Sequence, residues 1–185
     1  MIMEGPNVGE QIKRNKKYVF VTVGTTKFEE LIQIVDTDEC HQCLIELGYN
    51  GLLIQIGKGE FEPTVVSRNR NRMACEYYRF KDSLDDDMSE ASLIISHAGA
   101  GTVMGALGLR RRLVVVVNER LMGNHQTELA DALRARGHLA ACLTSSLIDT
   151  LKESHSQEMV PYDEPDLNLF PALINEEMGF IYSNK

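Results

Sequence analysis

The sequence predicts an α/β fold in which a parallel β-sheet carries helices on both faces. Short, continuous apolar runs alternate along the chain with longer segments whose apolar residues recur at helical spacing. Runs that are apolar at every position are typical of strands covered on both sides, as the strands of a parallel sheet are. Turns rich in glycine and threonine follow two of these runs. Together these observations indicate a doubly wound, Rossmann-like fold, in which ligands bind at the carboxyl ends of the strands.

One folded domain between two tails is expected. The 185 residues, of which 43% are hydrophobic, are enough for one core and too few for two full-sized domains. Residues 1–17 are polar and lack periodicity, so they are expected to form a flexible arm. The domain is expected to span residues 18–153. In the tail, residues 154–185, two prolines precede a short amphipathic helix at 170–178, and we expect this tail to pack on the domain or to reach a partner.

Apolar periodicity places the individual elements in order along the chain. Strands are expected at the buried runs, residues 18–23, 52–56, 76–80, 93–96 and 113–117. Helices are expected between them and after them, at residues 28–47, 84–91, 102–109, 125–136 and 146–153. The first helical segment is expected to break near Asp36-Thr37-Asp38, where an acid can cap a second helix.

The bulk composition excludes several classes of protein. The formal net charge is −8, whereas nucleic-acid binding usually needs a basic face, so no nucleic-acid partner is expected. No apolar run approaches the roughly 20 residues that span a bilayer, and the first residues lack the apolar stretch of a secretory signal. The chain is therefore expected in the cytoplasm. Its four cysteines are expected to be free thiols: Cys40, Cys43, Cys75 and Cys142.

Two turns between a strand and a helix are candidates for phosphate binding. Gly24-Thr25-Thr26 follows the first expected strand, where glycine lets the backbone approach a ligand and helix-N-terminal amides attract anions. A plain strand-to-helix turn with a threonine cap is the alternative. The second turn follows the fourth expected strand and consists of His97, Ala98, Gly99, Ala100, Gly101 and Thr102. Two such turns in one sheet could bind the same nucleotide.

The second turn also resembles a dinucleotide fingerprint. Gly99, Gly101 and Gly105 have nearly the glycine spacing of that motif, and Glu119 lies near the end of the next expected strand, where a ribose-binding acid belongs. The third glycine comes one position late. A nucleotide-dependent oxidoreductase is therefore an alternative with a loose match.

A third candidate segment, Asn124-His125-Gln126, follows the strand at 113–117 and opens a helix. Amide and imidazole groups at that place could read the hydroxyl and acetamido groups of a sugar. A helix cap with a surface histidine is the alternative. His97 and His125 could each act as a base, but the sequence places no carboxylate beside either of them. For both we expect ligand contact or capping.

No metal site is predicted. Asp85-Asp86-Asp87 has the D-x-D spacing of metal-dependent sugar transferases, but it opens an expected helix, where acids complement the helix dipole. Cys40-His41-Gln42-Cys43 has metal-like local spacing, yet no second pair follows it. The structural interpretation is favoured for both motifs.

Five segments occur in order along the chain: FVTVGTTKFEELI, LLIQIGKGEFEP, EYYRFKDSL, LIISHAGAGTVMGAL and VVVVNERLMGNHQTELADALRARGHL. Together they resemble one family, the cytosolic catalytic subunits of the UDP-N-acetylglucosamine transferase that adds the second sugar of the dolichol-linked oligosaccharide. The likeness covers roughly residues 18–138, and a weaker likeness covers residues 161–173. This family is similar to the C-terminal half of the bacterial transferase that makes lipid II, a two-lobed GT-B enzyme.

The resemblance implies that the chain is the donor-binding lobe of a split, inverting glycosyltransferase. The chain would bind UDP-GlcNAc and add a β1,4-linked GlcNAc to GlcNAc-diphosphodolichol. A membrane-anchored partner subunit would hold the acceptor and the probable catalytic base, and would recruit the chain to the cytosolic face of the endoplasmic reticulum as a heterodimer. The chain alone would be inactive. No cofactor or obligatory metal is implied, because positive helix ends would offset the charge on the leaving UDP.

The resemblance also assigns roles by position. Gly24, Thr25 and Thr26 would lie by the diphosphate, Phe80 near the uracil, and residues 98–102 along the nucleotide. Asn124, His125 and Gln126 would contact the GlcNAc. The partner interface is expected to include the C-terminal tail.

Two departures from the family pattern affect the expected activity. Gly105 stands where the family usually has an acidic residue that hydrogen-bonds the ribose, and losing such a bond weakens binding by about 1.5–3 kcal/mol. Arg110-Arg111-Arg112 replaces a small-basic-proline turn. The arginines either rebuild the start of the next strand or contact nucleotide or partner. A non-catalytic subunit that binds the same membrane partner is therefore the alternative function.

Overall fold

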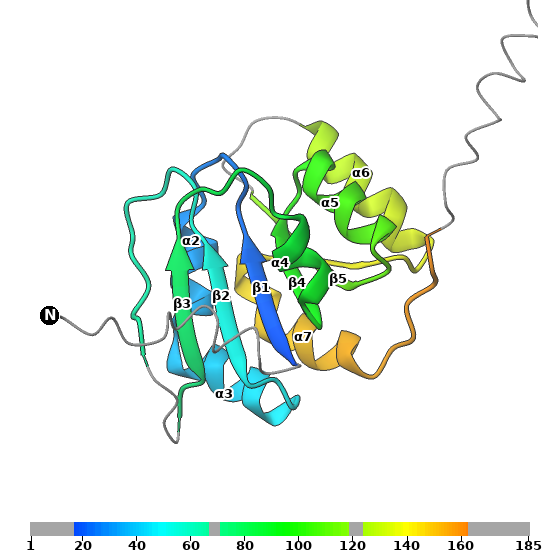
Figure 1. Ribbon diagram of the computed structural model, residues 1–185. Helices are drawn as coiled ribbons and strands as arrows, with labels where there is room; N and C mark the ends of the chain where they lie inside the picture. The colour runs from blue at the N-terminus through cyan, green and yellow to red at the C-terminus, as the bar shows by residue number, and fades with distance from the viewer. Residues whose placement is uncertain (1–16, 67–70, 119–123, 163–185) are drawn as a thin grey trace, which may run out of the picture.

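The computed structural model describes residues 17–66, 71–118 and 124–162, without the side chains of residues 124–127. Within these residues six parallel strands form one sheet in the order β3-β2-β1-β4-β5-β6 (Figure 1). The strands are β1 (Tyr18–Thr22), β2 (Gly51–Gln55), β3 (Ala74–Tyr78), β4 (Leu93–His97), β5 (Arg112–Val117) and β6 (Ala140–Leu143). This order, which reverses direction between β1 and β4, is that of the Rossmann fold.

Helices cover both faces of the sheet (Figure 1). They are α2 (Glu29–Val35), α3 (Asp38–Glu46), α4 (Asp85–Glu90), α5 (Ala100–Gly108), α6 (Asn124–Ala135) and α7 (Leu147–His155), the last preceded by a 3₁₀ turn at Thr144–Ser146. One hydrophobic cluster joins the sheet to α2, α3 and α7, and a second joins its other face to α4, α5 and α6. In the part of the chain that the structure describes, no helix is long and apolar enough to cross a membrane.

Alternation within the strands explains why they are apolar at every position. In β1, Val19 and Val21 belong to the α2/α3/α7 cluster, whereas Tyr18 and Phe20 belong to the cluster on the opposite face. Successive side chains of a strand point to opposite faces, so a strand covered on both sides needs an apolar residue at nearly every place. The predicted doubly wound fold is therefore confirmed, and so are the five predicted strands, each within two residues of its expected limits.

Two local predictions had different outcomes, and one strand was not predicted. The break in the first helical segment is confirmed, because Thr37 caps α3 by accepting a hydrogen bond from the Cys40 amide at 3.2 Å. The prediction that β3 is buried on both faces is wrong: β3 is an edge strand in which only Cys75 is buried. Strand β6 was not predicted, because it is four residues long, half-exposed and built from weak strand formers.

The chain beyond α7 turns back onto the domain. The Val160 amide donates to the Gly137 carbonyl at 2.9 Å, and the Val160 carbonyl lies 3.0 Å from Nδ1 of His138. The Tyr162 ring packs edge-on against that of His138, with 5.2 Å between ring centroids. The first part of the predicted tail therefore packs on the domain, while the predicted helix at 170–178 and the arm before residue 17 lie outside the described residues. All four cysteines are free thiols, as predicted.

Arg72 ties the segment before β3 to the junction between α2 and α3. Its guanidinium donates to the carboxylate of Asp36 and, at 2.6 Å, to the Asp36 carbonyl. The same guanidinium lies 3.2 Å from Nε2 of His41, which is fully buried. Burial, reinforced by the charge of Arg72, lowers the pKa of His41 to about 4. The native protein therefore holds His41 neutral near pH 7.

This buried histidine predicts a loss of stability in acid. The unfolded chain binds a proton at His41 below about pH 6.5, whereas the folded protein does so only near pH 4. The free energy of unfolding should therefore fall as pH drops from 6.5 to 4, by up to about 3 kcal/mol from this one group. Urea unfolding at pH 7 and pH 4.5 measures it. The drop should be smaller in His41→Gln, and equal drops in the two proteins would contradict the assignment.

Candidate functional site

The carboxyl ends of all six parallel strands lie along one edge of the sheet, called here the carboxyl edge. Strands β1 and β4 are neighbours, and their following helices, α2 and α5, leave toward opposite faces. This point is where doubly wound sheets form their ligand crevice, because the two connections diverge there. The two turns predicted to bind phosphate, residues 24–26 and 97–102, follow these two strands. The structure therefore places them side by side.

The turn after β1 is closed by its own backbone and one hydroxyl. Gly24 has φ of +60°, a left-handed conformation that glycine adopts without strain. Thr26 donates to the Val23 carbonyl through its amide at 3.2 Å and its hydroxyl at 2.8 Å. Thr25 is exposed at the tip. The hydroxyl of Thr26 thus shapes the turn, and Thr25 is the residue of this turn that faces outward.

The turn after β4 leads directly into α5. Ala98 is buried in the core, so only its backbone can meet a ligand, whereas Ala100 and Gly101 are exposed and Thr102 is half-buried. Gly99 is the N-cap of α5, and no side chain of the described residues caps this helix end. The first amides of a helix have no partner within the helix and carry its positive dipole end. This terminus can therefore receive an anion.

The imidazole of His97 packs between the two turns. A Cβ added at Gly24 would lie 2.9 Å from Cε1 of His97, and one added at Gly99 would lie 2.2 Å from Nε2. Both positions therefore require glycine as long as the ring keeps its place. His97 is 6% exposed, and burial lowers its pKa although a contact with the backbone of Thr22 opposes the shift. The ring acts here as a neutral spacer between the turns.

A buried polar network beneath the turns was not predicted. Gln55, the last residue of β2, and Thr22, the last residue of β1, are paired in the sheet and are 2% and 0% exposed. The Thr22 hydroxyl donates to Oε1 of Gln55 at 2.6 Å. One available signal was a polar residue at the last but one place of each of two otherwise apolar runs, 18–23 and 52–56.

Phe80 lies on the carboxyl edge just beyond β3. Its side chain is 52% exposed, so the ring is accessible for stacking. The neighbouring loops brace one another: the Lys58 amide donates to the Thr26 carbonyl at 3.0 Å, and the Arg79 guanidinium donates to Glu62 at 2.9 Å. The proposed base-binding residue therefore shares an edge with both glycine turns.

Asn124, His125 and Gln126 are the first residues of α6, the helix after β5. Because α6 follows a strand of the same parallel sheet, it begins at the carboxyl edge. The side chains of these three residues, and Glu119, lie outside the described part of the chain. Their predicted contacts with the sugar stay predictions.

The alternative of a dinucleotide-binding oxidoreductase is contradicted by the strand that the glycine motif follows. In dinucleotide-binding Rossmann domains the glycine fingerprint occupies the turn after the first strand. Here Gly99 and Gly101 follow β4, and the turn after β1 carries a single glycine, Gly24.

The three arginines lie at the opposite edge of the sheet. Arg110 and Arg111 link the end of α5 to β5, and Arg112 is the first residue of that strand. Contact of these arginines with a nucleotide at the carboxyl edge, one of the interpretations of the sequence, is therefore wrong. Arg110 has φ of +53°, and the Arg112 guanidinium donates to the Ser154 carbonyl. The Arg112 contact ties the start of β5 to the end of α7, and contact of the arginines with a partner stays a prediction.

The acidic motif at the start of α4 has a structural role. Asp87 is 1% exposed and accepts hydrogen bonds from the Tyr78 hydroxyl at 2.5 Å and from Nζ of Lys81 at 2.7 and 2.9 Å. A carboxylate engaged in this way anchors α4 to the loop after β3.

One further cluster has the composition of a metal site. Ligand atoms of Asp36, His41 and Cys75 lie within 4.8 Å of one another. The guanidinium of Arg72 contacts Asp36 and His41 and supplies the positive charge there. Burial raises the pKa of the Cys75 thiol to about 12, which disfavours the thiolate that a metal needs.

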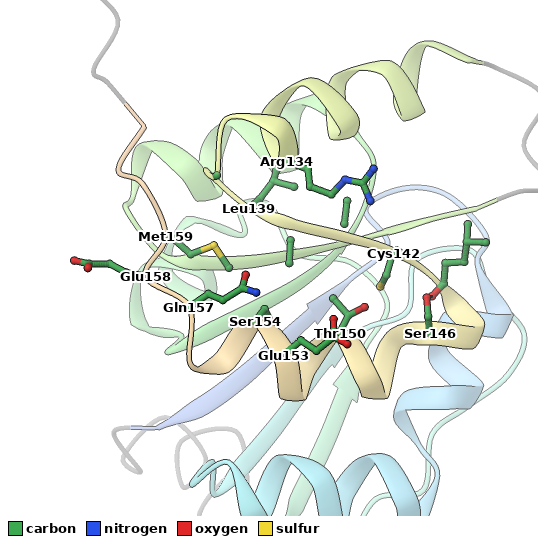
Figure 2. Close-up of a pocket in the computed structure, with 14 residues that line it drawn as sticks. Arg134, Leu139, Cys142, Ser146, Thr150, Glu153, Ser154, Gln157, Glu158 and Met159 are labelled. Carbon is green, nitrogen blue, oxygen red and sulfur yellow. The ribbon is translucent and has the colours of Figure 1, made fainter.

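Two hollows of similar volume lie on the surface of the described part of the chain. One, of about 500 Å³, follows the outer edge of β6 between α6 and α7, with Cys142 and Thr150 on its walls (Figure 2). None of the predicted site residues lines it. The other, of about 520 Å³, opens at the carboxyl edge between Phe28, at the start of α2, and the ends of β5 and β6.

The strand order, with two glycine turns at its reversal point and a helix terminus that no described side chain caps, defines a doubly wound, Rossmann-like α/β domain. Residues 18–175 match the glycosyltransferase family 28 C-terminal domain. The chain belongs to that family.

Its relatives include subunits of one transferase. It is 48% identical over 126 residues to the UDP-N-acetylglucosamine transferase subunit ALG13 of Mus musculus, a match that covers 68% of this chain and 11% of that protein. To the subunit of the same name from Yarrowia lipolytica it is 33% identical over 165 residues, covering 86% of this chain and 83% of that one. The chain thus spans about a ninth of the mouse protein and most of the yeast one.

Solved structures agree with the fold. The NMR solution structure of ALG13 superposes with a TM-score of 0.63 at 25% identity, covering 92% of this chain and 99% of that one. The crystal structure of Acinetobacter baumannii MurG gives a TM-score of 0.57 at 20% identity, covering 91% of this chain and 45% of MurG. The second likeness shows the fold alone.

Replacing Gly99 or Gly108 by alanine should have different effects on stability, because only Gly99 lies against the His97 ring. Gly99→Ala forces the His97 ring out of its place, so we expect a loss of about 1–3 kcal/mol in the free energy of unfolding. Gly108→Ala, at the end of α5, places its methyl group in open space and should leave stability unchanged or slightly raised. Urea unfolding compares the two variants. Equal stability of Gly99→Ala and the parent chain would refute the spacer role.

Proposed function

We propose that the chain is the donor-binding lobe of a split, inverting N-acetylglucosaminyltransferase. It binds UDP-GlcNAc at the carboxyl edge and delivers GlcNAc to a GlcNAc-diphosphodolichol acceptor held by a membrane-anchored partner subunit. The observation that carries the proposal is the meeting of the two glycine turns around His97 beside the N-terminus of α5. The names of the mouse and yeast relatives, UDP-N-acetylglucosamine transferase subunits, support the choice of donor.

The diphosphate is the part of the donor that this edge suits best. The amides at the start of α5 and the backbone of the turn at 24–26 can surround a phosphate pair, and Thr25 offers an exposed hydroxyl. As the anomeric bond breaks, negative charge grows on UDP. Backbone N–H groups that the fold already holds in place stabilise that charge without having to reorganise, which lowers the barrier to transfer. We infer that these helix-end amides take the place of an obligatory metal.

The base that activates the acceptor hydroxyl is assigned to the partner. His97 is buried between the two turns, so its imidazole cannot reach an acceptor outside them. Lys27, exposed near the first turn, is paired with Glu29 and Glu60 at 3.3 and 3.1 Å. A partner lobe over the carboxyl edge would bring acceptor and base together. Its membrane anchor would hold the heterodimer at the cytosolic face of the endoplasmic reticulum.

Gly105 favours a second candidate, a non-catalytic subunit that occupies the same partner. Gly105 lies on α5, and a Cβ added there would come to 3.4 Å from Cε of Met88, an ordinary contact. The position therefore has room for the Cβ that an acidic residue would add. If this candidate is right, the chain binds the partner normally, shows no measurable affinity for UDP-GlcNAc, and gains affinity in Gly105→Glu.

Transfer of GlcNAc from UDP-GlcNAc to a GlcNAc-diphospho-lipid decides between the two candidates. The chain is co-purified with its membrane subunit and compared with each part alone. We expect product from the pair and none from either part, because donor and acceptor sites lie on different chains. A well-formed pair that yields no product would contradict the transferase proposal and favour the non-catalytic subunit.

A further inference from the structure

The polar network beneath the glycine turns satisfies all of its hydrogen-bonding groups. Nε2 of Gln55 donates to the Gly24 carbonyl at 2.7 Å and to the Arg79 carbonyl at 2.7 Å. Its Oε1 accepts from the Thr22 hydroxyl at 2.6 Å. That hydroxyl accepts in turn from the Gly24 amide at 3.1 Å. One primary amide thus uses both of its N–H groups and its oxygen, and links the ends of three strands.

Burying an amide and a hydroxyl at the ends of two central strands costs free energy. Burying such groups loses their hydration, and an apolar pair of similar shape would stabilise the core about as well. The rest of β1 is apolar and buried, as is β2 before Gln55. What the polar pair does and an apolar pair cannot do is hold two loop carbonyls in fixed directions. The two carbonyls belong to the turn after β1 and to the loop after β3.

Fixing a carbonyl also aims the amide that follows it. In a planar trans peptide the C=O of one residue and the N–H of the next point in opposite directions, and the described residues contain no cis peptide. With the Gly24 carbonyl turned inward to Gln55, the amide of Thr25 points away from the core. With the Arg79 carbonyl turned inward, the amide of Phe80 does the same. Neither amide donates to another described residue.

We propose that Gln55 is a positioning residue that aims the amides of Thr25 and Phe80 at one nucleotide, the first toward its diphosphate and the second toward its base. Thr22 holds Gln55 in the required orientation. The inference rests on the proposed function, since it needs a nucleotide at the carboxyl edge. Because a single side chain bonds both loops, it also sets the spacing between the phosphate and base subsites.

Calorimetric binding of UDP to the full-length chain tests the proposal. Gln55→Met keeps the length of the side chain and removes the three hydrogen bonds, so the Kd for UDP should rise at least about tenfold. Thr22→Val removes the hydroxyl at nearly constant shape and should weaken UDP similarly. Thr22→Ser keeps the hydroxyl and should stay within about threefold of the parent chain. If Gln55→Met does not fold, the Thr22 pair carries the test.

A core variant separates positioning from stability. Leu151→Ala on α7, 2% exposed and in the cluster away from α5, should lower the free energy of unfolding but leave the Kd for UDP within about twofold. In amide NMR spectra without ligand, Gln55→Met should shift Thr25 and Phe80 together. Unchanged UDP affinity in Gln55→Met and Thr22→Val would overturn the positioning role and leave the proposed function standing. A parent chain that binds neither UDP nor UDP-GlcNAc would overturn both.

Discussion

The contact on which the site depends is the imidazole of His97 packed against Gly24 on one side and Gly99 on the other. The two glycines come from turns 75 residues apart in sequence, and they meet because β1 and β4 are neighbours in the sheet. A side chain on either glycine would collide with the ring, so the ring sets how closely the turns approach. Burial keeps the imidazole neutral, which avoids an unpaired buried charge beside the helix terminus.

The rest of the molecule holds this contact in place. Helices on both faces bury β1 and β4 completely, which leaves the strand ends little freedom. Gln55 and Thr22 then link the ends of β1, β2 and β3 through hydrogen bonds, so one side chain contacts both the turn after β1 and the loop that carries Phe80. The opposite edge carries the arginines and the returning segment 157–162. The residues of the proposed site are thus concentrated at the carboxyl edge.

Much of this could be predicted from the sequence because the local patterns are strong. Burial on two faces makes strands such as β1 and β4 continuous apolar runs, and Thr37 marks a helix start by its capping oxygen. The four residues of β6 carry no such pattern. The roles of His97 and Gln55 depend on neighbours distant in sequence, since Gly24 and Arg79 are brought to them only by strand order. Sequence could therefore point to the turns, and to His97 as part of one of them, but not to the contacts through which His97 and Gln55 join them.

The central claim, that a nucleotide sugar binds at the carboxyl edge around the β1–β4 reversal, is tested most directly by titrating the ¹⁵N-labelled chain with UDP-GlcNAc. We expect amide shifts that saturate together at residues 24–26, at Phe80 and at residues 99–102. The amides of Arg110 and Arg111 at the opposite edge should stay unmoved. Saturable shifts confined to the amino edge or to the hollow beside β6, or no saturable shift at all, would contradict it.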